Sequence, residues 1–274
     1  MRSFFSALKE ACINAFADGS FSTAKGAAYS LILAFFPTLL LLAEVLAGTR
    51  TTSALARELT HALERVLPPT SRQLATQYFS GSEHSYRITF AALGIALFAG
   101  TGVTGSFIEG IRSAYRLKYD WTIWHEEGLA LGLVFMAGTP MLAATALVVF
   151  GQQVEHFLLQ RTEYPALVVL GWAAARWLAA ILTGTLVTAI LYYLSPHCED
   201  RFTRVLPGAF MATVAWLLVS AGFGWYVKNM AVYSQIYGNL GTMIALMIWM
   251  YLAALIVLLG AQFNAVRERQ RRGA

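Results

Sequence analysis

Two charged side chains inside long apolar stretches are the first candidates for chemistry in this sequence. Arg176 is the one charged residue between Gly171 and Leu194, and Glu44 lies near the end of an apolar stretch that reaches Ala47. In lipid, a charge at the centre of the bilayer costs at least about 2.5 to 3.5 kcal/mol and usually has a partner or lines a pathway. We therefore predict that Glu44 and Arg176 pair in an outward-facing vestibule that recognises an anionic group or gates its passage.

The aromatic residues around Arg176 support a second interpretation, in which this side chain reaches the lipid headgroups. Trp172 and Trp177 lie beside the arginine, and Tyr192 and Tyr193 follow about 24 Å further along a helix. This spacing resembles the two aromatic belts at the surfaces of a bilayer. Arg176 would then lie near one surface and extend its guanidinium group to the headgroups. The sequence leaves both interpretations open.

Three glycines at the end of the second apolar stretch form the pattern GxGxxG. They are Gly100, Gly102 and Gly105, within GTGVTG. In dinucleotide-binding proteins this pattern follows a strand and opens the helix of a βαβ unit, but here it ends a stretch of membrane length, so no cofactor is predicted. We expect the glycines either to permit close helix packing or to break the helix and expose backbone groups to a cavity, and we count them as candidate pathway residues.

No set of residues has the spacing of a metal site or a catalytic centre. The run 125–127 (His-Glu-Glu) lacks the second histidine of HExxH, and the contiguous run 197–200 (His-Cys-Glu-Asp) would need a tight loop to converge. The two cysteines, Cys12 and Cys198, have no paired spacing. The sequence also lacks a GxSxG motif and a pair of acids on one helical face. We predict no metal, no catalytic residue and no enzymatic activity.

The composition and the apolar stretches together indicate a membrane protein. Hydrophobic residues make up 57% of the chain and charged residues 13%, about half of the roughly 25% found in soluble domains. Six stretches reach the length of about 20 residues that a membrane helix needs. They are 27–47, 88–108, 129–150, 166–194, 205–227 and 240–263. Because strands of a barrel alternate polar and apolar residues and these stretches do not, we predict an all-α fold, a polytopic bundle of six transmembrane helices.

Lysine and arginine residues are distributed unevenly between the two sides of this predicted bundle. A net charge of +5 would suggest nucleic-acid binding in a soluble protein, but here the location of the charges matters more. Twelve of these residues fall on the side of both termini, against seven on the other side, five of which lie in the 48–87 loop. The positive-inside rule places both termini in the cytoplasm. Membrane lipids are the expected partners, nucleic acid is not, and no oligomeric state is predicted.

Three regions follow from this topology. Residues 1–26 form a cytoplasmic amphipathic helix at the membrane interface that ends near Asp18 and Gly19. Residues 27–265 form the transmembrane domain, in which 48–87 is a periplasmic loop of short amphipathic helices. Residues 266–274 form a basic cytoplasmic tail. The N-terminal helix is predicted from residues at helical spacing: Phe4, Phe5, Leu8, Cys12 and Phe16.

Several motifs resemble the YihY/BrkB family of bacterial inner-membrane proteins, part of which was once labelled ribonuclease BN. The most specific are YGNLGTMIALMIWMY at 237–251 and LLGAQFNA at 258–265, and AAYSLILAFFP at 27–37 matches the first helix of the family. The resemblance implies six spans with cytoplasmic ends and a role in the envelope, in virulence or serum resistance, or in movement of lipids or solutes. The family usually has a carboxylate where this chain has Gln262, so a proton-coupling role of that acid is not carried over.

The C-terminal motifs supply the remaining candidate pathway or binding residues. They are Tyr237, Asn239, Gln262 and Asn264. Asn239 can cap the sixth transmembrane helix, and Tyr237 precedes it on the outer side. Trp249 shares one face of this helix with small residues, which favours close packing over a role in lining a pathway.

These observations favour a membrane protein that transports or flips an amphipathic or anionic substrate or lipid for the cell envelope. The alternative is a non-transporting scaffold or regulator of the envelope. No residue pattern in the chain supports ribonuclease activity.

Overall fold

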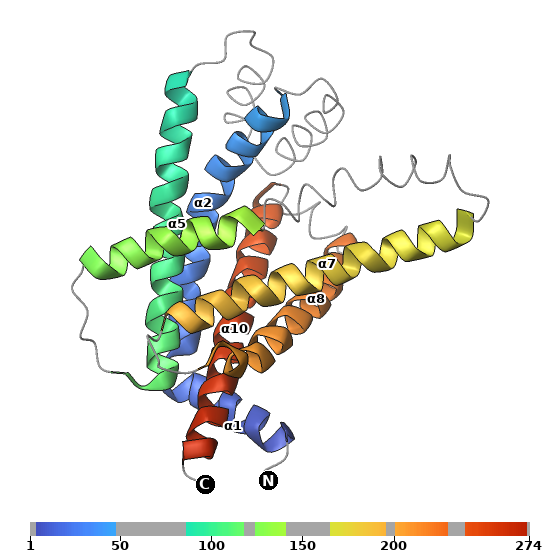
Figure 1. Ribbon diagram of the computed structural model, residues 1–274. Coiled ribbons are helices and arrows are strands. Elements are labelled where there is room, and N and C mark those ends of the chain that lie inside the picture. The colour runs from blue at the N-terminus through green and yellow to red at the C-terminus, as the bar shows by residue number, and fades with distance from the viewer. Residues whose placement is uncertain are drawn as a thin grey trace. The chain divides into compact units, whose positions relative to one another are not determined.

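The computed structural model describes residues 4–47, 86–117, 124–140, 165–195, 201–229 and 239–272. Within these residues every regular element is a helix and none is a strand, which confirms the predicted all-α class for that part of the chain (Figure 1). Residues 124–140 are helical. The other elements are α1 (Phe4–Ala17), α2 (Ser20–Ala47), α5 (Tyr86–Tyr115), α7 (Pro165–Leu194), the short 3-10 helix η2 (Phe202–Arg204), α8 (Leu206–Asn229) and α10 (Asn239–Arg272).

Four described helices contain a segment long and apolar enough to cross a membrane. The segments are Phe90–Tyr115, Val169–Leu194, Leu206–Tyr226 and Met243–Arg272. They coincide with the second, fourth, fifth and sixth predicted stretches. The first predicted stretch lies inside α2, and the third continues past residue 140, outside the described residues. The chain is therefore a multi-pass membrane protein built from helices.

The chain divides into two compact units. The first contains Met1–Ala24, Thr104–Leu218 and Leu255–Ala274, and the second contains Lys25–Val103 and Val219–Ala254. The boundaries fall inside long helices, so α2, α5, α8 and α10 each contribute to both units.

In the first unit, α1 packs beside the C-terminal half of α10 through small residues (Figure 1). Ala7 and Ala11 form a buried cluster with Phe263 of α10. Phe5 and Phe16, which the sequence analysis placed on the apolar stripe of this helix, are 79% and 80% exposed. The two alanines and Leu8, which packs against their cluster, make the packing face, whereas the phenylalanines point outward, as in a helix whose apolar side contacts lipid.

Two glycines allow α8 and α10 to approach each other closely in the first unit. A Cβ atom on Gly260 would lie 2.8 Å from the carbonyl oxygen of Gly208 and 2.8 Å from the Cβ atom of Ala212. Tyr192 of α7 is fully buried next to Gly260, and its hydroxyl donates to the carbonyl oxygen of Val257. Its assignment to an aromatic belt at the membrane surface is therefore wrong, because the ring packs inside the protein.

The helix α5 runs without interruption through Gly100, Gly102 and Gly105. The break that the sequence analysis considered at these glycines is therefore wrong, because a glycine keeps its intrahelical hydrogen bonds and the helix can continue through it. In the second unit, a Cβ atom on Gly102 would lie 3.1 Å from Oγ of Ser30 in α2. This contact confirms the other expectation, close packing of helices, for Gly102.

Candidate functional site

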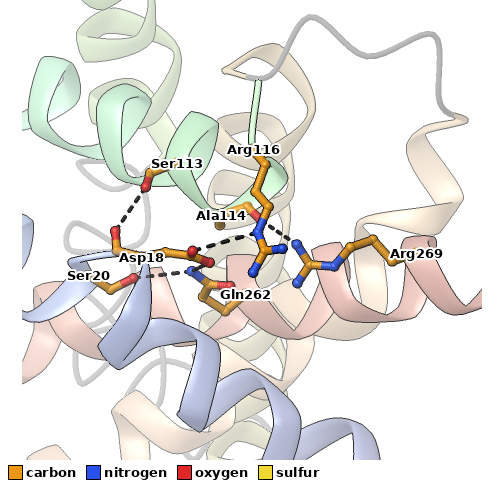
Figure 2. Close-up of polar contacts among 7 residues, drawn as sticks. All are labelled: Asp18, Ser20, Ser113, Ala114, Arg116, Gln262 and Arg269. Carbon is orange, nitrogen blue, oxygen red and sulfur yellow. Dashed lines mark hydrogen bonds and ion pairs between the residues drawn. The ribbon is translucent and has the colours of Figure 1, made fainter. Parts of the chain in front are cut away.

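Polar side chains from three segments of the first unit meet at one place (Figure 2). The segments are the turn between α1 and α2, the C-terminal end of α5, and the C-terminal half of α10. We call this set the polar cluster; it consists of Asp18, Ser20, Ser113, Arg116, Gln262 and Arg269.

Gln262 is the buried centre of the polar cluster. Its side chain is fully buried on α10 and points toward the α1–α2 turn (Figure 2). Nε2 donates to Oδ2 of Asp18 at 3.2 Å and lies 3.4 Å from Oγ of Ser20. Oε1 is buried as well and has no hydrogen-bond partner among the described residues. The amide nitrogen of Gln262 therefore has hydrogen-bond partners, and its amide oxygen can accept a hydrogen bond from a further donor.

Asp18 connects the α1–α2 turn to both of the other segments. The turn depends on Gly19, whose φ of 73° is in the left-handed region that glycine tolerates. The backbone carbonyl of Asp18 accepts from Oγ of Ser113 at 2.9 Å, and its carboxylate lies 3.7 Å from Nε of Arg116. Because 57% of the Arg116 side chain is exposed, this ion pair contributes only about 0 to 1 kcal/mol of stability.

The C-terminal end of α5 has the hydrogen-bond pattern of a Schellman motif. The N–H of Leu117 donates to the carbonyl of Arg112 at 3.1 Å, and the N–H of Arg116 donates to that of Ser113 at 3.0 Å. Glycine usually occupies the left-handed position of this motif, but here it is Arg116, with a φ of 55°. A side chain in this conformation costs about 1 to 2 kcal/mol, and it places the guanidinium group of Arg116 beside Asp18.

Arg269 adds a second guanidinium group to the end of α5. Its Nη1 donates to the carbonyl oxygen of Ala114 at 3.2 Å, where the negative end of the helix dipole favours a cation. Its other terminal nitrogen, Nη2, is buried and has no hydrogen-bond partner among the described residues. The polar cluster thus holds one acceptor and one donor that are buried and not satisfied.

Asn264, two residues after Gln262 on α10, binds the start of α8. Its Oδ1 accepts from the backbone N–H of Gly208 at 2.9 Å, and its Nδ2 donates to the carbonyl of Val205 at 2.8 Å. The first N–H groups of a helix have no partner inside the helix, so Asn264 caps α8 from another helix. This side chain was predicted as a pathway or binding residue, and its observed bonds stabilise the structure.

The predicted pair of Glu44 and Arg176 stays a prediction. Arg176 is half-buried on α7 in the first unit. Glu44 belongs to α2 in the second unit, and its side chain lies outside the described part of the structure.

The remaining predicted site residues lie in α5 and near the start of α10. Gly100 and Gly102 belong to the second unit and Gly105 to the first. Asn239 is the first residue of α10, where a helix cap was expected, and Tyr237 lies outside the described residues.

The sequence analysis named one member of the polar cluster as a site residue, Gln262, and missed the other five: Asp18, Ser20, Ser113, Arg116 and Arg269. Their one local signal is the Asp18–Gly19 dipeptide, which is typical of a turn.

Trp249 was assigned to helix packing. In the second unit its Nε1 donates to Oγ of Ser220 at 3.2 Å, which links α10 to α8. Among the described residues, no three histidine, cysteine, aspartate or glutamate side chains lie close enough to hold a metal ion.

Comparison with known proteins shows the family of this chain. The chain belongs to the virulence factor BrkB family, whose model matches residues 14–274. It is 29% identical over 177 residues to the ribonuclease-like protein YfkH of Bacillus subtilis, which covers 65% of this chain and 64% of that protein. It is 27% identical over 252 residues to a UPF0761 membrane protein of Aromatoleum aromaticum, covering 87% of this chain and 58% of the relative.

A shorter match is 40% identical over 76 residues, to a UPF0761 membrane protein of Tolumonas auensis, and covers 28% of this chain and 25% of the relative. The chain thus spans less than two thirds of the length of each of these relatives. No solved structure matches the chain significantly.

Proposed function

We propose that this member of the BrkB family is an inner-membrane protein with six spans and cytoplasmic termini that moves an amphipathic or anionic molecule across the bilayer. The observation that supports this most is the fully buried Gln262, whose Oε1 has no partner among the described residues. It lies in a helix that is apolar enough to cross a membrane, between Met243 and Arg272.

A buried polar atom without a partner costs about 1 to 3 kcal/mol, which a purely structural position would avoid with leucine. Arg269 presents an unmatched donor, Nη2, on the same helix and about 10.5 Å further along its axis. A molecule with a negatively charged group and a nearby hydroxyl or ammonium group would satisfy both atoms. This is the chemistry of many lipid headgroups and small anions.

Replacing Gln262 with leucine separates this function from a structural role. The variant loses a charge-assisted hydrogen bond to Asp18, which contributes about 1.5 to 3 kcal/mol, but it also removes an unsatisfied carbonyl that costs about 1 to 3 kcal/mol. We therefore expect the free energy of unfolding to change by less than about 1 kcal/mol, while transport falls by about tenfold because one bond to the substrate is lost. Transport is measured in proteoliposomes with fluorescent lipids and with a series of small anions.

The matched control is Thr213→Val, which removes a buried hydroxyl that bonds within its own helix, to the carbonyl of Ala209. Its transport should equal that of the wild type. If neither the wild type nor the control moves any lipid or anion, the envelope scaffold becomes the better hypothesis. If Gln262→Leu transports normally, the polar cluster is not part of the pathway.

The predicted pair of Glu44 and Arg176 is tested by a double-mutant cycle. We expect Arg176→Ala to inactivate or destabilise the protein, Glu44→Ala to reproduce that effect, and the double variant to be no worse than either one. Non-additivity is expected because each single change leaves the partner charge without its counter-ion in lipid. Additive losses in transport and in thermal stability would instead favour the interpretation in which Arg176 extends to the headgroups.

A further inference from the structure

A groove in the first unit is bounded by α1, the first turns of α8 and the C-terminal end of α10. It has a volume of about 740 Å³, within the range of about 300 to 1,000 Å³ typical of ligand sites. Its walls are mostly apolar. The apolar lining includes Ala7, Phe210, Met211, Ala215, Leu218 and Phe263.

One residue of the groove lining, Arg267, carries a positive charge. Arg267 lines the groove, and its guanidinium carbon lies 5.6 Å from the centroid of the Phe263 ring, in cation–π geometry. None of the lining residues is an acid. Gln270, also on the lining, donates to Oε2 of Glu10 at 3.0 Å, and that carboxylate is not part of the lining. An apolar groove with an arginine in its lining is complementary to an apolar chain with a negatively charged head.

The helices that bound the groove place it where lipid can reach it. Its α8 wall runs from Pro207 to Leu218 within the membrane segment Leu206–Tyr226, and Phe210 and Leu218 on this wall are 54% and 68% exposed. Its α1 wall belongs to the helix that turns Phe5 and Phe16 outward. Helices with such an apolar outer face lie at the boundary between acyl chains and headgroups, which is the depth at which a lipid phosphate meets an arginine.

We propose that this groove binds an anionic phospholipid, with one acyl chain along Phe210, Met211 and Phe263 and the phosphate on Arg267. The site is separate from the polar cluster and does not require the protein to transport anything. A lipid bound there would hold α1 against α8 and α10.

The charge requirement is tested with the full-length protein in detergent, incubated with phosphatidylglycerol or with phosphatidylcholine. Native mass spectrometry then measures the lipid that each protein retains. We expect the wild type to retain phosphatidylglycerol preferentially and Arg267→Gln to retain it about tenfold more weakly, as expected for the loss of one charge-assisted bond. Arg271→Gln is the matched control, because Arg271 is exposed on the same helix and does not line the groove. Equal retention in both variants would overturn the proposal.

The chain requirement is tested by filling the groove. Ala215→Phe places a ring in the groove and should lower the retention of both lipids, whereas Ala221→Phe, on an exposed position of the same helix, should not. In the wild type, which needs no substitution, a phosphatidylglycerol with a diazirine on its acyl chain should label residues 207–218 in preference to the exposed Trp177 and Leu182 of α7. Equal labelling of the two regions would refute the site.

These outcomes stay distinct from those of the proposed function. Gln262→Leu leaves every groove residue in place, so it should retain phosphatidylglycerol like the wild type even when its transport is lost.

Discussion

Gly208→Ala is expected to lower the free energy of unfolding by about 3 kcal/mol, at the upper end of the range for an overpacked core. The new Cβ atom would collide with the carbonyl oxygen of Gly260 and would lie 2.5 Å from Cγ of Asn264. The first of these atoms belongs to the backbone, so it cannot move aside by a change of rotamer. The crossing of α8 and α10 would have to open, and the buried ring of Tyr192 next to Gly260 would lose its packing. Thermal unfolding of the purified protein in detergent measures this loss.

The same substitution further along α8 provides the control. A Cβ atom on Gly222 would have no atom within 4 Å, so Gly222→Ala introduces no collision. Because alanine favours the helix by about 1 kcal/mol over glycine, this variant should be as stable as the wild type or slightly more stable. If the two variants unfold at the same temperature, the contact of α8 with α10 is not as close as the structure has it.

Asn264→Leu is expected to have the second large effect. Leucine has a similar size but leaves the buried N–H of Gly208 without its partner, whereas the carbonyl of Val205 keeps its bond to the N–H of Ala209. The unsatisfied N–H costs about 1 to 3 kcal/mol, and lipid around the helices gives it no water as a substitute. The start of α8 should therefore fray, which hydrogen exchange of the amides at 206–210 would detect together with a lower unfolding temperature.

Gln270→Leu is the matched control for this prediction, because it also removes an amide from α10. Its bond to Glu10 is only part-buried, so water can replace it and the loss should stay below about 1 kcal/mol. Asn264→Leu and Gly208→Ala should also be non-additive, since both changes act on the same pair of contacting residues. A fully additive double variant would place the two effects in different parts of the molecule.

Two atoms of the polar cluster that have no partner among the described residues, Oε1 of Gln262 and Nη2 of Arg269, make binding and transport the properties to measure first. The word ribonuclease in the name of the Bacillus subtilis relative describes that protein, whereas the two unsatisfied hydrogen-bonding atoms lie buried in an apolar helix in the described part of this chain. Transport assays with lipids and anions are therefore the first test of function, and the groove at Arg267 gives them a second, separate readout.

The sequence by itself determined that the chain is a membrane protein, that its fold is helical and where four of its membrane segments lie. These properties are local, because a helix in lipid makes all its backbone hydrogen bonds within one continuous stretch. A stretch of about twenty apolar residues therefore predicts a membrane helix whatever the rest of the chain does. The end of α1 near Gly19 was predicted for the same reason, since a left-handed turn requires a particular residue at a particular place.

Only the tertiary structure decided which residues meet. Asp18, Arg116 and Gln262 are far apart in the chain, and α7 and α8 are apolar around most of their circumference, so their pattern does not say which side faces a neighbour. The sequence analysis therefore named Gln262 without its partner Asp18, and it did not identify Ala7 and Ala11 as the residues through which α1 contacts α10. In lipid, helices associate through close contact and single hydrogen bonds, and which residues take part depends on the rotation and depth of each helix.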